Sequence, residues 1–301
     1  MTAPEPLFVL GPPRSFTSVV CAMLGQHPEM LGLPEVHLFA VDTVGELFYY
    51  YKLVGRRRQD GLLRTLAQVY MGKQTVQTVE LAQRRLGQRM EMETGALFRE
   101  IVAKVAPRIV VEKSVSTVWR ERALERMERA FPNARYIHLT RHPRSAGESM
   151  VEAVGNEKRL AREMMDYSTY PPTVDPQILW LTIHTNICNF LSFVPEDRKR
   201  RLKGEAMLTD VDCHLREIAQ WMGLRTDDEA LDEMKHPERS PFACLGPINA
   251  PFGNDPKFIK EPALRPARVK PQSLEGPVSW RGDGQGFAPE VKDLAKELGY
   301  E

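Results

Sequence analysis

An arginine and several hydroxyl residues stand together where the chain passes from an apolar run to a helical pattern. The run Leu7–Leu10 predicts a buried strand, and the residues from Ser15 to Gln26 have helical character. Between them lies GPPRSFTS, from Gly11 to Ser18. A loop that leaves a strand and enters a helix directs backbone N–H groups and the positive end of the helix dipole toward one point. This stretch therefore predicts a site for a phosphate or a sulfate.

The loop departs in two places from the triphosphate-binding pattern G-x-x-x-x-G-K-[ST]. Phe16 stands at the second glycine and Thr17 at the lysine, while the first glycine and the final hydroxyl are in register. Without that lysine the loop lacks the usual contact to β- and γ-phosphates. Arg14 and the hydroxyls of Ser15, Thr17 and Ser18 remain as donors for a smaller anion. A structural turn capped by Ser15 explains the stretch almost as well.

A second anion-binding pattern lies in TRHPRSAGES. Arg141 follows the predicted strand Tyr136–Leu139, and Ser149 lies eight residues further, about two helical turns along. Ligands collect at the carboxyl ends of parallel strands, so two such loops on one sheet favour a shared site. The alternative is that Arg141 pairs with a surface carboxylate.

The elements that must position these residues alternate between strand and helix. Ile109–Val111 predicts a further strand, and strands alternating with helices imply parallel βαβ units in an α/β fold. Helices are expected at Trp119–Phe131, from about Arg144, at Val211–Met222 and at Pro289–Leu298.

Two long segments interrupt this alternation. Residues 42–104 contain almost no strand signal and many helix formers, which predicts a helical insertion. Residues 237–289 are dense in Pro and Gly, which predicts a long irregular loop over a site. We expect residues 1–301 to form one domain that carries both segments.

Composition excludes several classes of function. The formal net charge of +1 gives no protein-wide field to attract nucleic acid or an acidic membrane. The four cysteines are scattered, without a spacing suited to a zinc site or a disulfide scaffold. The N-terminal apolar run is too short for a signal peptide or a membrane helix, so we expect a cytoplasmic protein without a membrane span or a metal.

Several separated stretches agree with one protein family. They are PPRSFTS with HPEM and Glu35 downstream, then VVEKS, then FPNARYIHLTRHPRSAGESM, and the terminal VKDLAKELGY. In these stretches the chain resembles sulfotransferases that use 3'-phosphoadenosine 5'-phosphosulfate (PAPS), above all the bacterial and tyrosylprotein enzymes. The resemblance implies a P-loop NTPase-like fold, PAPS as co-substrate, no metal, and a small-molecule or peptide hydroxyl as acceptor (EC 2.8.2.-).

The resemblance also implies roles for the residues of the two loops. The first loop would bind the 5'-phosphosulfate, and the second loop would bind the 3'-phosphate through Arg141 and Ser149. The residues of the first loop with this role are Arg14, Ser15, Phe16, Thr17 and Ser18.

Three further residues are implied in catalysis. Glu35 has the spacing from Arg14 that the family's base has, and a carboxylate can take the proton of an acceptor hydroxyl. His37 is the alternative base. Lys113 of VVEKS, together with Arg14, would stabilise charge on the transferring group. The plainer readings are a surface carboxylate for Glu35 and a solvated lysine beside Glu112 for Lys113.

The sequence departs from the family pattern in two places and matches it in a third. Phe16 replaces a usual glycine, and only glycine lacks the Cβ that limits φ. The stretch KGEAML lacks a tyrosine that many relatives have, which leaves the adenine contact open. In SLEGPVSWRG the resemblance implies cofactor contacts from Ser273, Trp280 and Arg281, whereas Trp280 could instead pack the final helix.

Two other functions compete with sulfonyl transfer. A P-loop kinase for small molecules would share the opening unit and would need ATP and Mg²⁺. A non-catalytic protein that binds PAPS or adenosine 3',5'-bisphosphate would retain the nucleotide site without turnover. The identity of the acceptor is not encoded in a recognisable motif, and a homodimer is kept open as an assembly.

Overall fold

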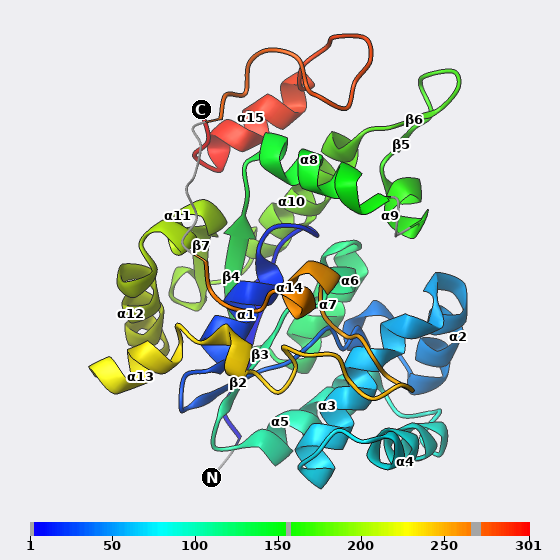
Figure 1. Ribbon diagram of the computed structural model, residues 1–301, viewed down its shortest axis with the longest axis vertical. Coiled ribbons are helices and arrows are strands. Elements are labelled where there is room, and N and C mark those ends of the chain that lie inside the picture. The colour runs from blue at the N-terminus through cyan, green and yellow to red at the C-terminus, as the bar shows by residue number, and fades with distance from the viewer. Residues whose placement is uncertain (1–2, 155–157, 266–271) are drawn as a thin grey trace.

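Five parallel strands form the centre of the computed structural model, which describes residues 3–154, 158–265 and 272–301 (Figure 1). Their order in the sheet is β2-β3-β1-β4-β7. The central strand pairs on both sides, with Phe8 opposite Glu112 in β3 and opposite Tyr136 in β4. The predicted α/β fold with a central parallel sheet is therefore confirmed. The strands are β1 Leu7–Leu10, β2 Met30–Gly32, β3 Ile109–Glu112, β4 Arg135–Thr140 and β7 Lys199–Lys203.

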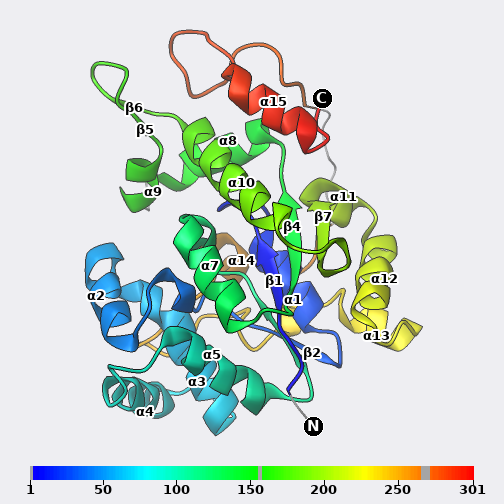
Figure 2. The ribbon, with the colours of Figure 1, turned by 180° about the vertical axis from the view of Figure 1, so that it is seen from behind.

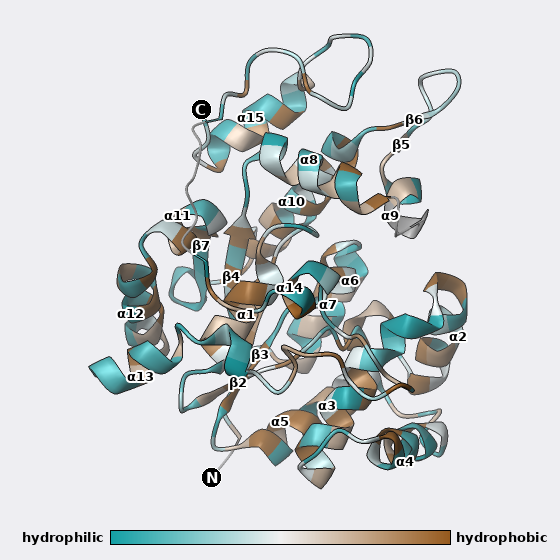
Figure 3. Cartoon of the chain, viewed as in Figure 1, coloured by the Kyte–Doolittle hydropathy of each residue, from teal (hydrophilic) through white to brown (hydrophobic). Residues whose placement is uncertain are grey.

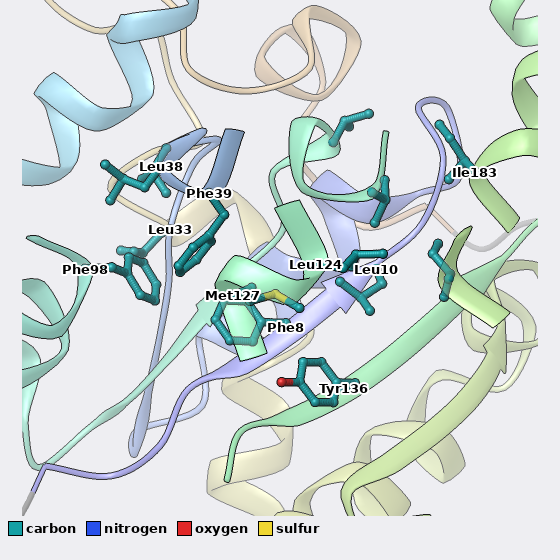
Figure 4. Packing of buried hydrophobic residues seen from close by; sticks show 14 of the residues in the cluster. Phe8, Leu10, Leu33, Leu38, Phe39, Phe98, Leu124, Met127, Tyr136 and Ile183 are labelled. Atoms are coloured by element: carbon teal, nitrogen blue, oxygen red, sulfur yellow. The ribbon is translucent and has the colours of Figure 1, made fainter. Parts of the chain in front are cut away.

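The side chains of β1 alternate between two apolar clusters, one on each face of the sheet. All four residues of the strand are buried, as the short apolar run predicts for a strand covered on both faces. Phe8 and Leu10 belong to the larger cluster, and Leu7 and Val9 to the smaller one. Figure 4 shows the larger cluster, in which the Phe8 ring lies 5.9 Å from the Tyr136 ring, centroid to centroid.

Helices cover both faces of the sheet (Figures 1 and 2). The smaller cluster is closed by α1 (Thr17–Gly25) and α12 (Val211–Met222), and α7 (Glu121–Ala130) and α10 (Pro176–Ser192) help to close the larger one. In Figure 3 the peripheral α13 is mostly hydrophilic, whereas α1, against the sheet, is largely hydrophobic. The other described helices outside the insertion and the C-terminal part of the chain are α6 Val115–Val118, α8 Pro143–Val154, α9 Lys158–Glu163, α11 Gly204–Thr209 and α13 Asp228–Glu233.

Helices make up most of residues 42–104, the segment in which the sequence predicts a helical insertion. Two of its helices start at capping boxes, in which the hydroxyl of Thr43 or Thr75 accepts from the backbone N–H three residues ahead. The 3₁₀ turn η2 (Arg56–Gln59) leads into α3 and carries three consecutive arginines. The insertion comprises α2 Val44–Val54, α3 Asp60–Met71, α4 Val76–Gly87 and α5 Thr94–Val105.

The described residues of 237–289 contain little regular structure, as predicted. They form the turn η4 (Pro237–Arg239) and the short helix α14 (Pro256–Lys260) before the final helix α15 (Pro289–Glu297) begins. Backbone contacts hold the loop to the rest of the fold, since the carbonyl of Gly253 accepts a 2.7 Å hydrogen bond from the N–H of Glu35.

Several elements differ from the sequence prediction. Strand β2, strand β7, helix α10 and the hairpin of β5 (Met165–Asp166) with β6 (Thr173–Val174) were not expected, nor was the short helix α6 that precedes α7. The helix predicted at Trp119–Phe131 is present as α7. Strand β7 reads KRRLK, which carries no apolar alternation. Its position at the edge of the sheet explains this composition, because charged residues on an edge strand oppose pairing with other chains.

The close packing of Gly61 predicts a site-specific loss of stability. A Cβ at Gly61 would lie 2.1 Å from the carbonyl oxygen of Glu35, so Gly61→Ala must displace that backbone. We expect the free energy of unfolding in urea to fall by about 1–3 kcal/mol, as for an overpacked core position. Gly87→Ala is the control, because a Cβ there meets nothing within 4 Å. It should change stability by about 1 kcal/mol or less, in the stabilising direction. Equal stability of the two variants would contradict the packing argument.

Candidate active site

The carboxyl ends of all five sheet strands supply the candidate site. Because the strands are parallel, the segments that follow them emerge at one edge of the sheet. The residues carried by these segments are Glu35 after β2, Lys113 after β3, Arg14 after β1, Arg141 after β4 and Gly204 after β7. Hydrogen bonds join Lys113 to Ser18 and Arg14 to Ser149, so residues predicted from distant motifs do come together.

The first loop has a backbone that is unusual for its residues. Arg14 and Phe16 have φ angles of 66° and 62°, in the left-handed region that favours glycine. Helix α1 starts without a side-chain cap, so the predicted alternative of a turn capped by Ser15 is wrong. The Ser15 hydroxyl is buried and has no hydrogen-bond partner within the described structure. An uncapped helix N-terminus with an unpartnered hydroxyl beside it fits an anion.

Arg14 already contacts a carboxylate. Its Nε donates to the Ser149 hydroxyl at 3.1 Å, and its Nη1 forms an ion pair with Asp255 from the long loop. Asp255 also caps α14, where its carboxylate accepts from the N–H of Lys257 at 2.8 Å. The long loop therefore places a negative charge against the predicted phosphosulfate arginine.

Glu35 is surrounded by three nitrogen donors. Its carboxylate lies 2.9 Å from Lys113 Nζ, 3.2 Å from His37 Nε2 and 3.4 Å from Arg58 Nη1. Burial by itself would raise the pKa of Glu35, but Lys113, and then His37 and Arg58, hold it well below its ordinary range. Glu35 is therefore a largely buried, ionised carboxylate whose side chain is 14% exposed, and its reading as a surface residue is wrong.

Lys113 connects Glu35 to the first loop. Its side chain has no exposed surface, and its ammonium donates to the Ser18 hydroxyl at 2.8 Å as well as to Glu35. The alternative of a solvated lysine beside Glu112 is wrong, since Glu112 is also buried. A single buried ammonium thus lies between the predicted base and the predicted anion-binding loop.

His37 uses both ring nitrogens. Nε2 faces Glu35, and Nδ1 lies 2.8 Å from the Ser116 hydroxyl. Burial lowers the pKa of His37, although the contact with Glu35 opposes this effect. A neutral ring satisfies both neighbours if Nε2–H donates to Glu35 and Nδ1 accepts from Ser116. In this arrangement His37 orients Glu35.

The second loop lies directly beside the first. Arg141 Nη1 donates to the backbone carbonyl of Arg14 at 2.5 Å, and Nε donates to the Ser145 hydroxyl at 3.1 Å. The Arg141 guanidinium also lies 4.4 Å above the ring centroid of Phe16. These contacts, rather than a surface carboxylate, hold Arg141 in place. Ser149 is nearly buried on α8 and faces Arg14.

The three residues predicted from SLEGPVSWRG make other contacts. Trp280 Nε1 donates to Asp175 at 3.0 Å, and Arg281 pairs with Asp175 and Asp283. The Ser273 hydroxyl accepts from the N–H two residues ahead. The Trp280 ring packs against Gly147 of α8, where a Cβ would lie 2.4 Å from the ring. The described contacts therefore join these residues to the N-terminus of α10 and to α8, not to the cluster of Arg14, Lys113 and Glu35.

A small pocket lies beside the Glu35 side chain and the segment 254–256 of the long loop. It is lined by Arg14, Ser18, Glu35 and Arg58 on one side and by the segment 254–256 on the other, and it encloses about 70 Å³. Sequence reasoning missed Arg58, Ser116 and Asp255. Asp255 carried one usable signal, because an aspartate before a proline is typical of a helix start. Arg58 and Ser116 carried none.

The burial of Glu112 predicts a pH-dependent contribution to stability. Burial raises the pKa of Glu112 from its ordinary 4.5 to about 7, against hydrogen bonds from Ser114 that lower it. Between these values the folded chain holds a proton that the unfolded chain has lost, so this contribution to stability is lost as the pH rises through the window. Glu112→Gln keeps an acceptor for Ser114 and removes the titration. In denaturant unfolding, the gain of Glu112→Gln over wild type should be larger at about pH 8 than at about pH 5, by up to about 3 kcal/mol. The same difference at both pH values would contradict the assignment.

Within residues 3–154, 158–265 and 272–301, no helix is long and apolar enough to cross a bilayer. No group of three or more His, Cys, Asp and Glu side chains there could hold a metal ion.

Comparison with solved structures shows that this fold is shared by bacterial sulfotransferase domains. The sulfotransferase domain from the Synechococcus PCC 7002 olefin synthase superposes with a TM-score of 0.74 at 22% identity, over 100% of this chain and 97% of that one. The sulfotransferase domain from the curacin biosynthetic pathway gives a TM-score of 0.71 at 22% identity, over 100% and 99% of the two chains. These likenesses establish a P-loop NTPase-like fold.

The family itself is shown by sequence. A search of curated proteins found no match. The model that describes the sulfotransferase family, however, matches residues 6–228, which include both predicted anion-binding loops, Glu35 and Lys113. The chain therefore belongs to the sulfotransferase family.

Proposed function

We propose that the protein transfers the sulfonyl group of PAPS to an acceptor hydroxyl. The observation that carries the proposal is the position of Lys113, whose ammonium contacts Ser18 at 2.8 Å and Glu35 at 2.9 Å. A donor anion in the first loop and an acceptor hydroxyl at Glu35 would then meet beside one cation. Membership of the family supports sulfonyl transfer over the kinase alternative.

The residues present fit PAPS. The unpartnered hydroxyl of Ser15, the uncapped start of α1 and Arg14 suit a 5'-phosphosulfate. Arg141 and Ser149 lie beside them and suit the 3'-phosphate. PAPS supplies a sulfonyl group bonded to a phosphate that can leave. In the transfer, the acceptor oxygen bonds to sulfur, the bond from sulfur to the phosphate oxygen breaks, and adenosine 3',5'-bisphosphate departs.

The charges around Glu35 require a coupled change if Glu35 is to act as the base. With three donors at its carboxylate, Glu35 is a poor proton acceptor. As negative charge develops on the leaving oxygen in the first loop, Lys113 would donate to that oxygen and withdraw from Glu35. The pKa of Glu35 would then rise as the acceptor proton arrives. His37 would keep the carboxylate oriented through this change.

Replacing Glu35 separates nucleotide binding from chemistry. Glu35→Gln preserves the size of the side chain but cannot accept a proton. We expect sulfonyl transfer from labelled PAPS to fall about 10²- to 10⁴-fold, the usual range for a lost general base. Calorimetric binding of adenosine 3',5'-bisphosphate should remain within about threefold of wild type, because the donor contacts lie in the loops. Glu80→Gln, on the exposed side of α4, is the control.

Unlike Glu35→Gln, Arg14→Ala should lose much of its nucleotide binding as well as its sulfonyl transfer. Arg84→Ala is its control, since Arg84 is exposed and contacts only Glu80 among its described ion pairs. Near-native transfer by Glu35→Gln or Arg14→Ala would contradict the proposed roles. Transfer of phosphate from ATP and Mg²⁺, with no transfer from PAPS, would favour a kinase. Binding without transfer to any phenol, alcohol, sugar or peptide in a panel would favour a non-catalytic nucleotide-binding protein.

Asp255 forms an ion pair with Arg14 and would compete with an anionic donor for its guanidinium. The pocket of about 70 Å³ is smaller than the roughly 300 Å³ or more of typical ligand sites, so the segment 254–256 must move for donor and acceptor to enter together. Asp255→Asn keeps the helix cap and removes the charge that competes for Arg14. We expect adenosine 3',5'-bisphosphate to bind about three- to tenfold more tightly. Weaker binding would show that the carboxylate assists the bound state instead. Asp283→Asn is the control, because Asp283 pairs with Arg281.

A further inference from the structure

The aromatic residue in the first loop occupies a backbone position that disfavours it. Phe16 has φ 62° and ψ 9°, at the residue that precedes α1. An L-residue with a bulky side chain is strained in this left-handed region, whereas glycine is not. The backbone conformation therefore favours glycine at this position, so the contacts of the Phe16 side chain must explain why an aromatic residue stands here.

The ring of Phe16 is held between two elements that follow neighbouring strands. Behind it lies Gly204, the first residue of α11, at which a Cβ would lie 2.5 Å from Phe16 Cδ2. Above it lies the Arg141 guanidinium, 4.4 Å from the ring centroid. Because Gly204 has no side chain, it leaves the space that the ring of Phe16 fills.

Two hydrogen bonds and the ring of Phe16 fix the orientation of the Arg141 guanidinium. Its Nη1 donates to the carbonyl of Arg14, and its Nε donates to Ser145. The face of an aromatic ring attracts a guanidinium and leaves its N–H groups free to donate in the plane. Phe16 therefore supplies a flat surface against which Arg141 is oriented.

We propose that Phe16 is a positioning residue for Arg141, so that the ring, with Gly204 making room for it, determines preference for a 3'-phosphorylated nucleotide. This inference rests on the proposed function, in which Arg141 meets the 3'-phosphate. Phe16 acts through Arg141 and takes no part in the chemistry. The alternative is that the ring only fills space, since it also packs at the margin of the smaller apolar cluster.

The test compares two ligands that differ only in the 3'-phosphate, adenosine 3',5'-bisphosphate and adenosine 5'-monophosphate, by calorimetric titration of the full chain. Phe16→Gly removes the ring and relieves the backbone strain. We expect its affinity for the bisphosphate to fall about five- to tenfold, the range of a cation–π contact, with no change for the monophosphate. Phe16→Tyr keeps the aromatic face and should retain wild-type preference.

Gly204→Ala tests the same contact from the other side. The added methyl group must push the Phe16 ring, so this variant should show the same selective loss as Phe16→Gly. Added to Phe16→Gly, it should have little further effect, because the ring that it displaces is already absent. Thermal unfolding of each variant shows whether it is folded at the titration temperature.

The outcomes separate this inference from the proposed function. Wild-type protein that binds both nucleotides equally would overturn the proposed function and the inference together. Wild-type preference for the bisphosphate that persists in Phe16→Gly would overturn the inference alone. Equal losses for both nucleotides in Phe16→Gly would also overturn it, since they would show that the ring only supports the loop.

Discussion

The buried ion pair between Lys113 and Glu35 is the contact on which the rest of the site depends. An ammonium with no exposed surface is stable only if it is paired, and here Glu35 and the Ser18 hydroxyl meet that need together. Without Glu35, the buried Lys113 ammonium would keep the Ser18 hydroxyl but would lose the one carboxylate that the described ion pairs give it. The pair therefore holds the segment after β2, the segment after β3 and the first loop in one fixed relation.

The fold provides this relation through the order of its strands. Glu35 and Lys113 come from neighbouring strands on one side of β1, and Arg141 comes from β4 on the other. The first loop lies between them and contacts both sides. Glycine residues allow other segments to pack closely against the edge of the sheet. At Gly61, for example, a Cβ would lie 2.1 Å from the carbonyl oxygen of Glu35. The long loop completes the enclosure through Gly253 and Asp255.

The local charge of the site differs from that of the whole chain. The net charge is only +1, yet four cationic side chains gather at the carboxyl edge of the sheet: Arg14, Arg58, Lys113 and Arg141. The described ion pairs set two carboxylates against them, one from Glu35 and one from Asp255. A polyanionic donor would meet these cations, with Asp255 as the charge that it replaces at Arg14. A local gathering of cationic side chains of this kind is invisible in composition.

The sequence by itself determined the elements whose signal is local. The apolar run of β1, the turn that follows it and the helix formers of residues 42–104 each depend on neighbouring residues, and the structure confirms them. The family motifs also indicated which residues of the two loops, with Glu35 and Lys113, share one site. By contrast, β7 carries no apolar alternation and is a strand only because β4 pairs with it.

Only the tertiary structure decided how the side chains of the site are partnered. Asp255 meets Arg14 across 241 residues of chain, and Arg58 reaches Glu35 from the insertion. Such long-range contacts also bury Lys113, lower the pKa of His37 and place the ring of Phe16 against Gly204. A local pattern shows which residue types can bind an anion. Which of them do so depends on desolvation and on opposite charges brought from elsewhere, because both act through space rather than along the chain.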